Sequence, residues 1–298
     1  MQVPTLYYVK RCVKKNVGAG PIVKLFSMDT VVSINMKEID TFDQQGYVIV
    51  KNLLSQFDIE KLARIVDRIY AQWLSENRAD FIEHRLVNMH TLTDSRYFVG
   101  RKAERLLFFQ AIASNKLTQL IDNMFGDGIY FHNTQLFFNP FENKKLPYWH
   151  RDMQYSPIDD AILKNEQQNM VSLHVRIPLI QEQGIELIPG THKRWDTELE
   201  RDVRLELNGR KNSEDLPDSV LIELTPGDAL IFSAQMIHRG NYRLNESRKS
   251  LDLCIGKYHP LTSVYINKNA LPDIAELDKI ENNRWFRAAC GLMAGNKM

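Results

Sequence analysis

The chain has 298 residues, which is long enough to bury a substantial core without disulfide bonds. It is 44% hydrophobic and 25% charged with a mean hydropathy of −0.35, which is typical of a globular enzyme and excludes a disordered or fibrous protein. The 38 basic and 37 acidic side chains almost cancel, so no overall field attracts nucleic acid or anionic lipid. We therefore expect a small-molecule substrate, and neither nucleic acid nor a membrane as partner.

The chain is expected to consist of a basic N-terminal extension at 1–35 and a single folded domain at 36–298. The extension lacks the apolar block of a secretion signal, and no apolar run approaches the roughly 20 residues that cross a bilayer. The three cysteines, Cys12, Cys254 and Cys290, fit neither a disulfide framework nor a CxxC metal site. A cytoplasmic location is predicted, and the oligomeric state is left open.

The first half of the folded domain is predicted to be largely helical. Residues 42–54 read as a turn followed by a short strand rich in β-formers. Ser55 and Asp58 form a capping pattern, after which apolar residues recur at helical spacing. A second helical region is predicted over 103–125, and Gly126 is its stop signal.

The second half of the chain is predicted to be rich in strands. Helices that come first, followed by strands that do not alternate with helices, favour a mainly β jelly roll with flanking helices. The charged segment 194–219 is too long for a hairpin, and we interpret it as an inserted flap or partial helix over one mouth of the barrel. The predicted strands cover 129–138, 170–179, 185–188, 220–224, 229–233 and 250–255.

Three residues form a candidate metal site. His150 and Asp152 are two positions apart, so in a strand they would project to the same face, and His238 would approach from a neighbouring strand. Two imidazoles and one carboxylate make up the facial triad of non-heme iron(II) oxygenases. Such a triad leaves coordination positions for a bidentate oxoacid and dioxygen. We predict that His150, Asp152 and His238 are metal ligands and catalytic residues.

A candidate anion clamp follows the distal histidine in the sequence. Arg248 and Ser250 are separated by the spacing of one strand face, so both can point at the same ligand. A guanidinium with an adjacent hydroxyl suits the distal carboxylate of 2-oxoglutarate, whose oxoacid end would chelate the iron. The alternative for Arg248 is a surface arginine in a basic run.

Taken together, these motifs are similar to those of the phytanoyl-CoA dioxygenase family, within the iron(II)- and 2-oxoglutarate-dependent oxygenases. The similarity spans about residues 40 to 258 in order and spacing. The matching segments are Phe42 to Val50, Trp149 to Asp152, Ile188 to Lys193, Thr225 to Asp228, Phe232 to Asn241 with His238, and Arg248.

The resemblance implies a double-stranded β-helix, the cupin-like jelly roll, which agrees with the strand-rich second half. It also implies that Gln135 and Asn139 hold the 2-oxoglutarate end nearer to the iron. The alternative is that the polar residues around Gln135 form an exterior face of the strand. The cofactors implied are Fe(II), 2-oxoglutarate as cosubstrate and O2, with ascorbate as reductant in vitro.

The predicted function is an iron(II)- and 2-oxoglutarate-dependent dioxygenase that hydroxylates an unactivated carbon of a small molecule and releases succinate and CO2. One alternative is a cupin-like zinc-dependent metalloenzyme with the same ligands, which would not need Arg248. Another is a binding protein that retains the barrel without turnover. The sequence does not identify the substrate.

Arg176 departs from the family pattern, which places a large apolar or aromatic residue at this inward-facing strand position. A buried arginine needs an anionic partner. We consider two: a pair with Glu186 on a neighbouring strand, and an anionic group of the substrate. Under the second interpretation the substrate carries a carboxylate, phosphate or sulfate.

Overall fold

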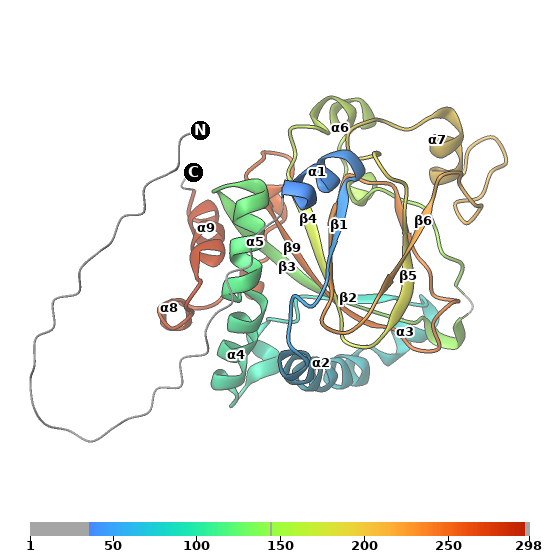
Figure 1. Cartoon of the computed structure of the whole chain (residues 1–298). Helices are drawn as coiled ribbons and strands as arrows, with labels where there is room; N and C mark the ends of the chain where they lie inside the picture. The colour runs from blue at the N-terminus through green and yellow to red at the C-terminus, as the bar shows by residue number, and fades with distance from the viewer. Residues whose placement is uncertain (1–35, 144, 296–298) are drawn as a thin grey trace, which may run out of the picture. The chain divides into compact units, whose positions relative to one another are not determined.

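The structure, a computed structural model, describes residues 36–143 and 145–295 (Figure 1). The predicted basic extension, 1–35, lies outside the described residues, so the proposed domain boundary stays a prediction. Within the described ranges, no helix is both long and apolar enough to cross a bilayer.

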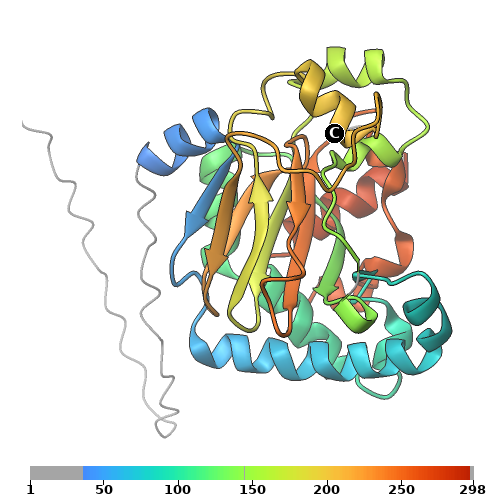
Figure 2. The same ribbon diagram turned by 90° about the vertical axis from the view of Figure 1, so that its right-hand side faces the viewer.

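Most helices pack around the sheets rather than between the strands (Figures 1 and 2). The long helix α2 lies at the opposite end of the sheets from α6 and α7 in both views. The helices are α1 Met36–Gln45, α2 Gln56–Glu76, α3 Arg78–Glu83, α4 Lys102–Ile112, α5 Asn115–Phe125, α6 Asp160–Glu166, α7 Glu198–Arg204, α8 Ile274–Leu277 and α9 Arg284–Met293.

The start of α2 confirms the predicted capping pattern. The hydroxyl oxygen of Ser55 accepts a hydrogen bond from the backbone N–H of Asp58, which satisfies one of the free donors at the helix end. The apolar stripe of α2 is buried, from Ile59 at 2% exposure to Trp73 at 7%. Burial of this stripe attaches α2 to the core.

The second predicted helical region is two helices, not one. The backbone turns at Ala113, which ends α4, and Ser114 caps α5 by accepting a hydrogen bond from the N–H of Leu117. A serine at this position competes with helix continuation, because its side chain offers the backbone an alternative acceptor. Gly126 ends α5 as predicted, with a φ of 72° that favours glycine.

The strands form two antiparallel sheets that face each other and are not closed into one barrel. The larger sheet has the order β1-β7-β4-β9-β3-β2, and the smaller has the order β6-β5-β8. The strands are β1 Tyr47–Val50, β2 Asn88–His90, β3 Ile129–Phe138, β4 Ser172–Pro178, β5 Glu182–Leu187, β6 Val220–Leu224, β7 Ala229–Ser233, β8 His238–Gly240 and β9 Lys249–Lys257.

The predicted strands are confirmed, with bounds that shift by a few residues. β3, β6 and β7 match their predicted ranges, whereas β5 begins at Glu182, ahead of the predicted start at 185. The short strands β2 and β8 were not predicted, because three residues carry too little periodicity to be recognised.

The central strands β4 and β9 are buried on both faces, which have different chemistry. Alternate side chains point toward the helices and join the main apolar core, including Leu173 and Val175 of β4 and Leu253 of β9. The intervening side chains, such as His174 and Arg176, point toward the smaller sheet and line a cavity. The register pairs Arg176 with Asp252, so the polar groups of the two strands meet on this face.

Candidate metal centre and anion clamp

A cavity of about 400 Å³ lies between the two sheets and contains the predicted triad. Its walls come from β3, β4, β7 and β9 on one side and from β5 and β8 on the other. His150, Asp152 and His238 form the one group of potential metal-ligating side chains found among the described residues. Their ligand atoms all lie within 4.8 Å of one another.

The three ligand atoms converge on one point. Oδ1 of Asp152 lies 3.6 Å from Nε2 of His150 and 3.4 Å from Nε2 of His238. The two imidazole rings are 4.2 Å apart between centroids. This is a compact face of two nitrogens and one oxygen, which is the donor set of the facial triad.

The backbone arrangement that builds this face differs from the one predicted. His150 is an isolated bridge partner of His238, with backbone N to O distances of 2.9 and 3.0 Å in the two directions. Asp152 does not continue a strand; it begins a 3-10 helix that runs from Asp152 to Tyr155. The carboxylate of Asp152 therefore reaches the histidines because the chain turns after His150. The three side chains are grouped as predicted, but the predicted cause, alternation along a strand, is wrong.

Both histidine rings are oriented by backbone carbonyls. Nδ1 of His150 lies 3.2 Å from the carbonyl oxygen of Tyr148, and Nδ1 of His238 lies 3.0 Å from that of Met236. A ring that donates from Nδ1 keeps the lone pair on Nε2 available for a metal. Burial, together with the nearby His238, lowers the pKa of His150 to about 3, so this imidazole is neutral.

The second oxygen of Asp152 is held by a histidine that the sequence analysis did not select. Nε2 of His174 lies 2.7 Å from Oδ2 of Asp152. Burial alone lowers the pKa of His174, but Cys254 and Asp152 beside its ring raise it well above the usual value. Burial likewise raises the pKa of Asp152, and His174 and His238 outweigh it and hold that pKa well below its usual value. His174 shares a strand face with Arg176, and this spacing was the available signal.

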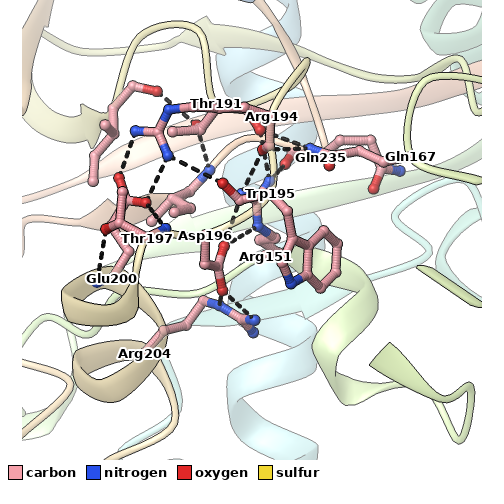
Figure 3. A network of polar contacts seen from close by, with 12 residues as sticks. Arg151, Gln167, Thr191, Arg194, Trp195, Asp196, Thr197, Glu200, Arg204 and Gln235 are labelled. Atoms are coloured by element: carbon pink, nitrogen blue, oxygen red, sulfur yellow. Dashed lines mark hydrogen bonds and ion pairs between the residues drawn. The ribbon is translucent and has the colours of Figure 1, made fainter. Parts of the chain in front are cut away.

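Arg151, between His150 and Asp152 in the sequence, anchors their turn to the charged segment 194–219 (Figure 3). Its guanidinium is 3% exposed and donates to Asp196 at 2.8 Å, to the Thr191 carbonyl at 2.7 Å and to the Gln235 carbonyl. Asp196 is also bound by Arg204, at 2.7 Å, from α7. The prediction of a partial helix in 194–219 is confirmed, and Arg204 of this helix binds the same Asp196 that holds Arg151.

The predicted clamp residues meet at a carboxylate of the protein. Arg248 is 3% exposed, and its Nε donates to Oε1 of Glu182 at 2.5 Å. The Ser250 hydroxyl donates to Oε2 of the same side chain. Nη1 and Nη2 of Arg248 have no hydrogen-bond partner among the described residues, although both are buried. The surface alternative for Arg248 is therefore wrong.

This geometry agrees with the family assignment. The sequence profile of the phytanoyl-CoA dioxygenase (PhyH) family matches residues 42–250. The chain belongs to this family. Membership confirms the predicted resemblance and the assignment to the dioxygenase class of oxidoreductases.

The chain is similar in sequence to one characterised relative and in fold to two solved structures. Ectoine dioxygenase from Sphingopyxis alaskensis is 21% identical over 224 residues, 70% of this chain and 71% of that protein. The structure of HygX from Streptomyces hygroscopicus with nickel and 2-oxoglutarate has a TM-score of 0.54 at 12% identity, covering 76% of this chain and 88% of that one. EctD from S. alaskensis with 2-oxoglutarate and 5-hydroxyectoine has a TM-score of 0.51 at 17% identity, covering 75% and 76%. These likenesses confirm the double-stranded β-helix class.

The two residues that the family pattern implied near the iron end have different surroundings. Gln135 lines the cavity, where its Nε2 lies 3.4 Å from Sγ of Cys254. Asn139 is absent from the described cavity lining, and its amide donates to the carbonyls of Asn245 at 2.9 Å and Glu246 at 3.2 Å. Asn139 thus holds the turn that precedes Arg248.

Arg176 is buried, at 2% exposure, and the predicted Glu186 pair is wrong. Its Nε donates to Oδ1 of Asp252 at 2.8 Å, and its Nη1 lies 4.0 Å from Oε1 of Glu182. Glu186 instead accepts from Arg239 at 2.8 Å. The register explains the difference, because Asp252 lies directly opposite Arg176 in the neighbouring strand.

Proposed function

We propose that this protein is an iron(II)- and 2-oxoglutarate-dependent dioxygenase that hydroxylates an unactivated carbon of a small molecule. The observation that carries the proposal is the content of one cavity. It combines a two-histidine, one-carboxylate cluster with a buried Arg248 whose terminal nitrogens have no partner among the described residues. A zinc hydrolase would use only the cluster, whereas an oxoacid cosubstrate would use both.

The cluster fits iron(II) in its chemistry. His150 and His238 would bind through Nε2, the nitrogen opposite the one that faces a backbone carbonyl. Asp152 would bind through Oδ1, because its Oδ2 is already held by His174. Two imidazoles with one carboxylate leave the rest of the coordination sphere to the cosubstrate and dioxygen.

Arg248 fits the distal carboxylate of 2-oxoglutarate. Nη1 and Nη2 form the end of a planar fork, which matches the two oxygens of a carboxylate. We propose that Ser250 acts through Glu182, because its hydroxyl hydrogen is donated there. Gln135 is proposed to contact the end of the cosubstrate nearer the metal. No contact with the cosubstrate is proposed for Asn139, which does not line the cavity.

When bound, the iron and cosubstrate would supply oxidation of a substrate carbon coupled to release of succinate and CO2. The protein's part is to position the substrate, and Tyr148, Met153, Tyr155 and Thr262 supply neutral walls for it. Burial raises the pKa of Tyr148 and of Tyr155, so both phenols are hydrogen-bond donors near neutral pH. A cavity of about 400 Å³ suits a small molecule.

The test begins with the wild-type protein under anaerobic conditions. Fe(II) and 2-oxoglutarate together should give a visible absorption band that neither gives alone. Admission of O2 with ascorbate should then yield succinate, slowly without primary substrate. Both signals should vanish in His150→Ala and His238→Ala, because a facial site that lacks one ligand loses most of its iron affinity.

The exposed His84 provides a matched control, and His84→Ala should keep both the band and the succinate yield. If either ligand variant binds iron and turns over like the wild type, the ligand assignment fails. No band in the wild type, combined with zinc-dependent hydrolysis, would favour the zinc metalloenzyme. Tight oxoacid binding without turnover would favour the binding protein.

We further propose a cytoplasmic location. Cys254 and Cys290 are free thiols, and Cys254 is buried against the cavity. Free thiols are maintained in reducing compartments. Fluorescence microscopy of a C-terminally tagged full-length chain would test the proposal.

A further inference from the structure

Three buried charged side chains lie beside the cavity in addition to the proposed metal ligands and Arg248. Arg176 is 2% exposed, and the carboxylates on either side of it, Asp252 and Glu182, are each 1% exposed. Ionised groups are costly to bury unless each is paired. Arg176 is within ion-pair distance of both carboxylates, so the three groups form one cluster.

One end of this cluster reaches the proposed metal ligand. Oδ1 of Asp252 accepts a hydrogen bond from Nε of Arg176 at 2.8 Å. Oδ2 of Asp252 has no hydrogen-bond partner among the described residues and lies within ion-pair distance of Nδ1 of His174, at 3.3 Å. The other nitrogen of His174 contacts Oδ2 of Asp152 at 2.7 Å. His174 is stacked on Phe232, with centroids 4.9 Å apart, so the ring can turn little. The orientation of Asp152 thus depends on Asp252.

The other end of the cluster reaches the clamp. Nη1 of Arg176 lies 4.0 Å from Oε1 of Glu182, and the same oxygen accepts from Nε of Arg248 at 2.5 Å. Both guanidinium groups also lie against one ring, that of Phe137, at 4.5 and 5.5 Å from its centroid. The direction in which Arg248 presents its terminal nitrogens therefore depends on Glu182 and, through it, on Arg176.

We infer that Arg176 is a positioning residue that links the two halves of the site, holding Asp152 through Asp252 and His174, and Arg248 through Glu182. The inference rests on the proposed function, because it concerns the groups that would bind iron and 2-oxoglutarate. It replaces the need for a substrate anion at Arg176, whose charge is already matched by protein carboxylates.

Loss of Arg176 should affect both halves for different reasons. On the metal side, Asp252 loses its donor and no longer fixes His174, so Asp152 is less well oriented. On the clamp side, Glu182 loses one of two neighbouring positive charges, so the clamp presents a less positive field to an incoming carboxylate. A residue that served only to fill space would change neither affinity.

The experiment measures two affinities in Arg176→Met. Mn(II) alone, followed by the electron paramagnetic resonance signal of the free ion, reports the metal half in the absence of cosubstrate. 2-Oxoglutarate, titrated by calorimetry into protein saturated with Mn(II), reports the clamp half. We expect both dissociation constants to rise by about tenfold, the scale of losses when a group behind a metal ligand is removed.

Arg176→Lys separates the effect on Mn(II) affinity from the effect on 2-oxoglutarate affinity. It also replaces the methionine variant as the test if that variant fails to fold. Lysine keeps the positive charge near Glu182 but lacks the Nε donor to Asp252. Mn(II) binding should weaken, while 2-oxoglutarate binding to the Mn(II)-saturated protein should stay within about twofold of wild type. Equal affinity to wild type on both measurements would overturn the inference.

Arg105 supplies a matched control. It is 6% exposed, pairs with Glu276 at 2.5 Å and lies over Phe109, so Arg105→Met removes a buried, paired arginine that does not line the cavity. This variant should lose stability but keep both affinities. If Arg176→Met loses only one affinity, Arg176 acts locally and the link is wrong. If the wild type binds neither probe, the proposed function itself fails and the inference falls with it.

Discussion

The two faces of β4 and β9 have equal burial but opposite chemistry. Toward the helices, Leu173, Val175 and Leu253 are 0 to 2% exposed and belong to the main apolar core. Toward the smaller sheet, Arg176 and Asp252 are 1 to 2% exposed and carry charge. Burial on one face removes apolar surface from water and stabilises the fold, whereas burial on the other opposes stability and holds a site in place.

The site and the core therefore share the same strands but differ in what burial contributes: stability on the helix-facing side and fixed polar groups on the cavity-facing side. A substitution on the helix-facing side should reduce the free energy of unfolding and leave ligand affinities alone. A substitution on the cavity-facing side should reduce ligand affinity as well, and it also costs stability wherever it leaves a buried charge without its partner. The following variants test how separable the two faces are.

Among substitutions on the cavity-facing side, Arg248→Leu should reduce ligand affinity most strongly. Loss of a desolvated charge-assisted contact to a carboxylate is worth about 2 to 5 kcal/mol, so the dissociation constant of 2-oxoglutarate should rise tens to thousands of fold. Mn(II) binding should change little, because Glu182 is still held by Ser250 and lies near Arg176. Calorimetric titration of each ligand checks both statements, and unchanged oxoglutarate affinity would refute the clamp.

Leu253→Ala should break the helix-facing side instead. Leu253 is 1% exposed within the main core, and truncating such a side chain costs about 2 to 5 kcal/mol of stability. Urea unfolding would measure the loss, and Mn(II) and 2-oxoglutarate titrations of the folded variant should match wild type. A large loss of either affinity would show that the two faces are not independent.

The smallest expected effect is a change in acid sensitivity from Glu182. Burial raises the pKa of this carboxyl, but Arg176 and Arg248 outweigh it and lower that pKa from its ordinary value of 4.5 to about 2. The unfolded chain therefore takes up the proton at higher pH than the folded protein. The stabilisation from this group is complete above pH 4.5 and is lost as the pH falls toward 2.

Glu182→Gln should consequently show a shallower fall in the free energy of unfolding between these two pH values than wild type. The slopes are compared rather than the absolute stabilities, because the variant also leaves Arg176 and Arg248 less well paired. Parallel slopes would mean that Glu182 is not ionised in the folded protein at low pH.

Much of the fold could be predicted because strong local signals agreed with the tertiary structure. The capping pattern at Ser55, the stop at Gly126 and the β-rich runs of 129–138, 220–224 and 229–233 are each specified within a few residues. The division of 103–125 into two helices was missed, because the apolar pattern continues across Ser114 while the backbone does not.

The grouping of the site could be predicted, but the contacts that orient it could not. His150, Asp152, His238 and Arg248 converge as the motifs indicated. His174 and Glu182 depend on register across strands, which one sequence does not reveal, and the start of β5 was predicted three residues too late to include Glu182. Because the register is not evident from the sequence, Glu186 was considered as the partner of Arg176 in place of Asp252.

The charged segment 194–219 has a consequence for protein engineering. It looks like an appendage in the sequence, yet it binds the residues on both sides of His150. The Asn212 and Glu214 carbonyls accept from the backbone and the indole of Trp149, each at 2.8 Å, while Asp196 accepts from Arg151. Trimming the segment to widen the cavity would loosen the turn that carries His150 and Asp152, so libraries aimed at new substrates are better directed at Tyr155 and other exposed wall residues.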